Sequence, residues 1–141
     1  MKRLTPETIA NKKIRDHIEY AKGTKTICVS TVLSFLGISP DDYTYTSSKK
    51  NRYVYEGVLR RNGYSVRSRM SELKLRKGST MTKVRKALRK SDYGSKDYFM
   101  YLGYQKGSAH LILLNGNGKT IIDTAPSKRY KLESIKIVEK N

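Results

Sequence analysis

The side chain best suited to covalent chemistry in this sequence is its one cysteine, Cys28. The apolar segment that begins at Cys28 and stops at Gly37 predicts a helix, which places the thiol at a helix N-terminus. The unpaired N–H groups and the dipole of a helix start lower the pKa of a thiol and favour the nucleophilic thiolate. The alternative interpretation, a small buried hydrophobic residue, fits the same pattern.

A histidine and an aspartate on a predicted β-hairpin supply the groups that a nucleophilic thiol needs. Residues 115–118 have the sequence Asn-Gly-Asn-Gly, a strong hairpin signal between two predicted strands. As a four-residue loop, this turn pairs Leu114 with Lys119 and sets His110 directly opposite Asp123, about 5 Å apart at Cβ. The carboxylate would then orient the imidazole as a general base. A structural histidine and an aspartate that only forms a turn remain the alternatives.

The rest of the pattern predicts helices first and antiparallel strands second. The predicted helices cover 5–23, 28–36, 51–62 and 80–90, and the predicted strands cover 64–70, 98–104, 108–114, 119–123 and 130–138. This order predicts an α+β fold in a single domain, residues 1–141, with the cysteine-bearing helix at its centre. The second histidine, His17, falls beside charged residues on the first predicted helix, and we interpret it as a surface or interhelical residue.

The net charge of +18 is concentrated in the middle of the chain. Residues 49–90 contain fifteen basic and two acidic side chains. Such a field attracts polyanions, so nucleic acid, an acidic protein and an anionic membrane surface are all candidate partners. Lys83, Lys86 and Lys90, on the predicted helix 80–90, are the candidate contact residues. A solvated basic face that only confers solubility is the simpler interpretation.

Composition bears on the cellular location of the protein and on the membrane, metal and disulfide features it can have. No apolar run approaches the ~20 residues that span a bilayer, and the first residues lack the apolar stretch of a secretory signal. One cysteine forms no internal disulfide and no Cys-rich zinc site. We therefore expect a soluble protein of the cytoplasm (of the host cell, or the virion, if it is viral) that uses no membrane, metal or cofactor.

Several segments resemble papain-like cysteine peptidases. Residues 26–37 resemble their cysteine-bearing helix, particularly that of the bacteriocin-processing branch, and residues 107–114 and 118–124 are similar to their histidine and aspartate strands. Residues 77–84, followed by a strand and the histidine hairpin, resemble small phage-encoded proteins of this type. The resemblance covers roughly residues 20–126. It implies a bacteriophage source and N-terminal helices, one of them central and carrying the cysteine, packed on a C-terminal antiparallel sheet.

The resemblance also implies a role for each site residue. The nucleophile would be Cys28, the general base and acid His110, and the orienting carboxylate Asp123. These peptidases usually carry a Gln shortly before the cysteine as an oxyanion donor, and Lys22 occupies that position here. Thr24, Lys25 or Thr26 would substitute for it, together with the Cys28 backbone N–H. Loss of one oxyanion donor typically lowers the rate by about 10²–10³.

Two classes of function remain in view. The first is a cysteine peptidase or related thiol hydrolase that cleaves a peptide, isopeptide or similar amide bond, with the basic segment recruiting an acidic protein or peptide. The second is a non-catalytic basic protein that binds nucleic acid or belongs to a virion, with tyrosines such as Tyr53, Tyr55 and Tyr64 stacking on bases. No Gly-rich phosphate loop, zinc-ligand spacing or helix-turn-helix signature favours a specific nucleic-acid module.

Overall fold

The computed structural model describes residues 27–38, 51–105, 108–123 and 129–141. The chain divides into two compact units, Met1–Gly63 and Tyr64–Asn141, here called the N-terminal and the C-terminal unit. Cys28 belongs to the first unit, and His110 and Asp123 belong to the second. The prediction of a single domain concerns how these two units pack, and it stays a prediction.

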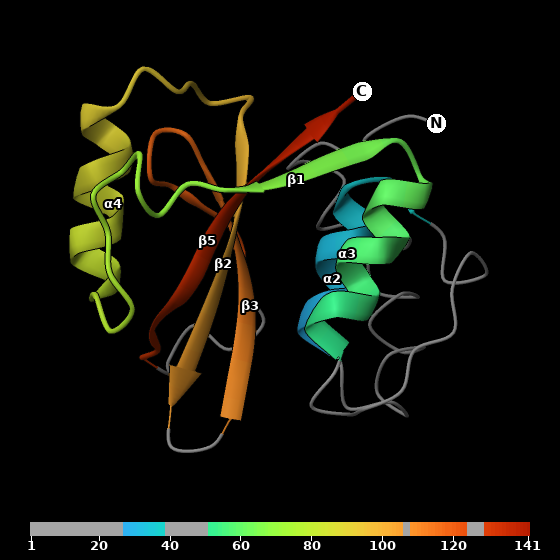
Figure 1. Ribbon diagram of the computed structural model, residues 1–141, viewed down its shortest axis with the longest axis horizontal. Helices are drawn as coiled ribbons and strands as arrows, with labels where there is room; N and C mark the ends of the chain where they lie inside the picture. The colour runs from blue at the N-terminus through green and yellow to red at the C-terminus, as the bar shows by residue number, and fades with distance from the viewer. Residues whose placement is uncertain (1–26, 39–50, 106–107, 124–128) are drawn as a thin grey trace. The chain divides into compact units, whose positions relative to one another are not determined.

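Two helices, α2 (Ile27–Phe35) and α3 (Asn51–Arg61), lie side by side in the N-terminal unit (Figure 1). The prediction of an apolar helix beginning around Cys28 is confirmed by the bounds of α2. From Thr31 onwards, this helix buries both its apolar and its small polar side chains. Gly37 ends the helix in a left-handed conformation (φ 87°), and the Ile38 N–H donates to the Leu33 carbonyl oxygen at 3.0 Å. This is the glycine-dependent helix end that the sequence predicted. The predicted helix 5–23 lies outside the described residues.

The C-terminal unit is built on a five-stranded antiparallel sheet. In chain order its strands are β1 (Tyr64–Ser68), β2 (Tyr98–Gln105), β3 (Ser108–Asn115), β4 (Thr120–Ile122) and β5 (Lys131–Lys140). They lie side by side in the order β1-β5-β2-β3-β4, so the last strand of the chain is inserted between β1 and β2. The α+β class and the C-terminal antiparallel sheet are therefore confirmed, and all five predicted strands are present.

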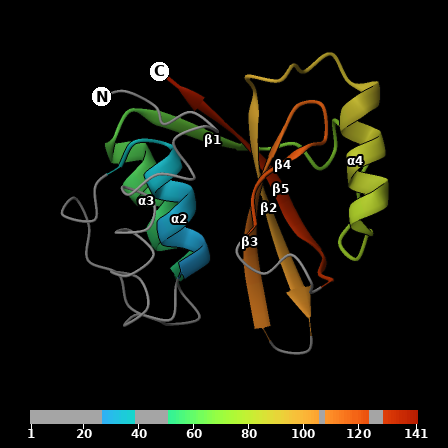
Figure 2. The same ribbon diagram turned by 180° about the vertical axis from the view of Figure 1, so that it is seen from behind.

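One face of this sheet is covered by α4 (Met81–Lys90), as Figures 1 and 2 both show. Thr80 begins the helix, and its hydroxyl accepts a hydrogen bond from the Lys83 N–H at 3.2 Å. Val84 and Leu88, four residues apart on one side of α4, are fully buried. They pack in one apolar cluster with strand residues that include Phe99, Tyr101, Ile112, Leu114, Ile135 and Ile137. None of the helices in the described part of the chain has the length and apolar character to cross a membrane.

The β3–β4 hairpin confirms the predicted turn, but its loop is shorter than expected. The Asn115 N–H donates to the Lys119 carbonyl oxygen, and the Gly118 N–H donates to the Asn115 carbonyl oxygen, both at 2.9 Å. Gly118 has a left-handed backbone (φ 79°), which suits the last residue of a three-residue loop. The loop is therefore 116–118 rather than the predicted 115–118, and the strands are offset accordingly.

The register predicted for His110 and Asp123 is therefore wrong. Leu114 pairs with Thr120, and an irregularity in the ladder then pairs Leu113 with Ile122. Continued by one residue, this register sets Asp123 beside Ile112 instead of directly opposite His110. Residues two apart on a strand share a face, so Asp123 becomes a diagonal neighbour of His110.

Tyr101 is the largest side chain in the apolar cluster that is fully buried. Its hydroxyl donates a hydrogen bond to the Tyr130 carbonyl oxygen at 2.7 Å. Burial raises the pKa of Tyr101 to about 12, while the positive charge of Arg85 acts in the opposite direction.

Stability should fall between pH 10 and about 12, the ordinary and the folded-state pKa of Tyr101. Above pH 10 the unfolded chain loses the phenolic proton while the folded chain retains it, so deprotonation favours unfolding. Free energies of unfolding in urea across this pH range should decline for the wild type and decline less for Tyr101→Phe. An equal decline in both proteins would contradict this account of Tyr101.

Candidate active site

His110 and Asp123 meet on one face of the sheet. The Nε2 atom of His110 lies 2.8 Å from the Oδ1 atom of Asp123. Both side chains are largely shielded from solvent, with exposed fractions of 6% and 14%. His110 shares its strand face with Ile112 and Leu114, which belong to the cluster packed against α4. The structure thus brings two of the three predicted catalytic residues together, although not by the predicted register.

This contact sets the tautomer of His110 when Asp123 is ionised. A carboxylate only accepts hydrogen bonds, so Nε2 must carry the proton that it shares with Oδ1. In the neutral imidazole the lone pair then lies on the other nitrogen, Nδ1. A general-base role for His110 would therefore use Nδ1, with Asp123 holding the ring in that tautomer.

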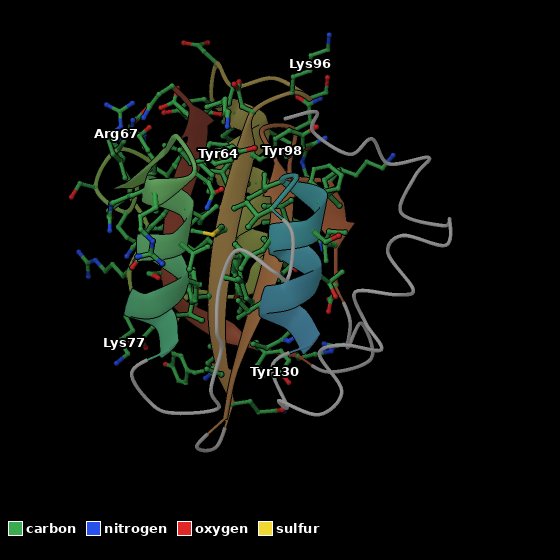
Figure 3. The ribbon with its side chains drawn as sticks, turned by 90° about the vertical axis from the view of Figure 1, so that its right-hand side faces the viewer. Tyr64, Arg67, Lys77, Lys96, Tyr98 and Tyr130 are labelled. Carbon is green, nitrogen blue, oxygen red and sulfur yellow. The ribbon has the colours of Figure 1, made fainter. Side chains whose placement is uncertain are left out.

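Gly103 and Tyr130 define the surroundings of the His110 ring. Gly103 is the cross-strand partner of His110 on β2. A Cβ atom at this glycine would lie 2.5 Å from the Tyr130 Cβ and 2.9 Å from a ring carbon of Tyr101. The missing side chain therefore lets Tyr130 approach, and its ring lies 4.9 Å from the imidazole, measured between centroids, at an interplanar angle of 32°. Figure 3 shows Tyr130 at one end of the sheet and Tyr98, the first residue of β2, at the other.

Arg85 of α4 fixes the hairpin that carries Asp123. Its guanidinium donates to the Gly118 carbonyl oxygen at 2.6 Å and to the Thr120 hydroxyl at 2.7 Å. These two bonds run from the helix to the loop and to the first residue of β4. Because Asp123 directly follows β4, the helix that covers the sheet also restrains the position of the carboxylate.

Cys28 is the second residue of α2, so the predicted placement of the cysteine in the first turn of a helix is confirmed. It lies in the N-terminal unit, and its pairing with His110 stays a prediction. The candidate oxyanion donors Thr24, Lys25 and Thr26 lie outside the described residues.

The three candidate polyanion-binding residues, Lys83, Lys86 and Lys90, are all exposed on α4. Their spacing of three and four residues sets them along one side of the helix. This side differs from the one through which Val84 and Leu88 contact the sheet.

Sequence reasoning missed the residues that surround the His110–Asp123 pair. One signal was present: Gly103 interrupts an aromatic-rich strand, and a glycine inside a strand often marks a bulge or a close backbone approach. The ladder between β2 and β5 is indeed irregular between Leu102 and Gly103. The contacts made by Tyr130 and Arg85 depend on segments that are distant in sequence, and no local pattern marks them.

Comparisons with protein-family models, with curated proteins and with solved structures found no match for this chain. The resemblance to papain-like peptidases therefore stays a prediction. Within the described residues, no group of three or more His, Cys, Asp or Glu side chains could hold a metal ion.

Replacing Gly103 with alanine should destabilise the protein by about 1–3 kcal/mol, because the new methyl group would overlap Tyr130 and Tyr101. The matched control is Gly57→Ala in α3, where the nearest atom is 3.4 Å away at the flexible end of Arg61. Removing a glycine from a helix interior should instead stabilise by about 0.5–1 kcal/mol. Urea unfolding measures both changes, and equal stability of Gly103→Ala and wild type would contradict the close approach of Tyr130.

Proposed function

We propose that this protein is a thiol hydrolase that cleaves a peptide or related amide bond. The observation that carries the proposal is the shielded contact between His110 Nε2 and Asp123 Oδ1 at 2.8 Å. A carboxylate that fixes one ring nitrogen prepares the other for proton transfer, as in Ser–His–Asp and Cys–His catalytic groups. The position of Cys28 in the first turn of α2 adds support, since helix N-termini activate thiols.

In the proposed reaction, Nδ1 of His110 accepts the thiol proton and the Cys28 sulfur attacks the carbonyl carbon. The tetrahedral intermediate collapses, the C–N bond breaks, and His110 returns its proton to the leaving amine. The resulting thioester is then attacked by water, which gives a proton to His110. The C–S bond breaks, the acid is released, and the thiol recovers its proton. The overall reaction is a hydrolysis without oxidation or reduction, so its steps require no redox cofactor.

The alternative proposal, a non-catalytic nucleic-acid binder or virion component, has less support from the described residues. Tyr55 and Tyr64, two of the tyrosines considered for base stacking, are buried. Buried rings are unavailable to bases, so such a binder would depend mainly on phosphate contacts to lysines and arginines.

Alkylation of Cys28 by iodoacetamide, followed across pH 4 to 9, tests the proposal without a known substrate. The wild type should label with an apparent pKa well below the ordinary thiol value of about 8.5. At pH 6 it should react roughly tenfold or more faster than His110→Ala. The thiolate is the form that reacts, and a thiol that is not activated is almost entirely protonated at this pH.

The matched control is the other histidine of the chain. His17→Ala should label as the wild type does, while Asp123→Asn should fall between the wild type and His110→Ala. Slow labelling with an ordinary pKa, unaffected by His110→Ala, would mean that Cys28 and His110 do not act together.

A further inference from the structure

A basic groove runs between α4 and the turn that precedes it. Its volume is about 550 Å³, and its lining includes four lysines, Lys74, Lys83, Lys86 and Lys90, above an apolar floor to which Leu73 and Ala87 contribute. The groove lies entirely in the C-terminal unit, and both walls pack on the same apolar cluster. Leu73 and Ala87 are only partly buried, so their side chains remain available to a ligand.

The charge of the groove is not neutralised by the residues around it. The four lysines come from two segments, the turn at Lys74 and helix α4. In the part of the chain that the structure describes, none of the four makes an ion pair. The acidic residue of the lining, Glu72, is already engaged. Its carboxylate lies 3.1 Å from the Arg69 Nε and accepts a hydrogen bond from the Tyr93 hydroxyl at 2.6 Å. An incoming anion would therefore meet four ammonium groups whose charge is not cancelled within the groove.

The backbone conformation at Lys74 fixes the turn that forms one wall of the groove. Lys74 has φ 56°, in the left-handed region, and is the only residue other than glycine with a positive φ in the described part of the chain. The turn is fixed by bonds from the Lys74 N–H to Ser71 and from the Leu75 N–H to Met70, at 3.1 and 2.9 Å. Glycine or asparagine would adopt this conformation at lower cost. A lysine there places a fourth positive charge on the wall that faces α4.

We propose that this groove binds an acidic peptide segment in which an apolar side chain stands among carboxylates. Ammonium groups pair with carboxylates, and the floor offers an apolar contact between them. From Lys83 to Lys90 the helix rises about 10 Å, which an extended peptide spans in about three or four residues. The volume also suits a few side chains.

Nucleic acid fits the groove less well than a peptide does. Base-tolerant binding of single strands depends on aromatic side chains for stacking, and none of the residues that line this groove is aromatic. A duplex would need a much larger surface, on the order of 1,000 Å² or more. The inference goes beyond the proposed hydrolase, because the groove would bind its ligand whether or not Cys28 is reactive.

The experiment uses the full chain carrying Cys28→Ala, so that covalent chemistry plays no part. The probe is a short fluorescein-labelled peptide in which glutamates flank one leucine, followed by fluorescence anisotropy at low salt. Replacement of Lys83, Lys86 and Lys90 by glutamine should raise Kd roughly tenfold or more. The matched control replaces Lys96, Lys119 and Lys131, which are exposed elsewhere in the same unit, and should change Kd by less than about twofold.

Further probes distinguish peptide binding in the groove from general electrostatic attraction to a basic protein. A peptide with serine in place of leucine should bind a few-fold more weakly to the wild type, because it loses the apolar contact. Equal losses in the two triple variants would overturn the proposal by showing a diffuse charge effect. Tighter binding of an oligothymidylate of equal charge would assign the groove to nucleic acid instead, and absence of peptide binding would also overturn it.

Discussion

The pair formed by His110 and Asp123 is a shielded polar contact beside the apolar cluster under α4, and its geometry constrains the C-terminal unit. Shielding an imidazole or a carboxylate from solvent reduces the stability of the fold unless the group has a hydrogen-bond partner. Here the two satisfy one another across 2.8 Å, next to Ile112 and Leu114, which are packed in the core. The strands must therefore hold a register that allows this contact, and a slip of one residue would turn a side chain to the other face.

The supports of that pair extend into the hydrophobic core. Tyr101 is buried among core residues and holds the Tyr130 backbone, while the Tyr130 ring lies against His110. Arg85, on the helix that covers the same core, holds the hairpin on the Asp123 side. Packing of α4 on the sheet and orientation of the imidazole are thus linked by a short chain of direct contacts. The imidazole is thus held by residues that directly flank strands, Asp123 after β4 and Tyr130 before β5.

The sequence predicted the elements well because their signals are local. Apolar spacing identified α2 and α4, and Gly37 marked the end of α2 through a backbone requirement that acts within a few residues. The proximity of His110 and Asp123 was predictable because a hairpin joins strands that are adjacent in sequence. Their register was not, since it depends on the left-handed conformation of Gly118 and on an irregularity in the β3–β4 ladder. The position of Tyr130 and the groove beside α4 arise from contacts between distant segments, which periodicity does not report.

The proposed function requires the Cys28 thiol to reach the Nδ1 atom of His110, and the two residues belong to different compact units. Reaction with 1,3-dibromoacetone tests it most directly, because a thiol alkylated at one end of this short reagent can be bridged only to a nucleophile within its three-carbon reach. Proteolysis and mass spectrometry of the treated wild type should recover one cross-linked product that joins the Cys28 and His110 peptides, absent from His110→Ala. A single adduct on Cys28 with no bridge, or a bridge from Cys28 to His17 or to a lysine, would contradict the account.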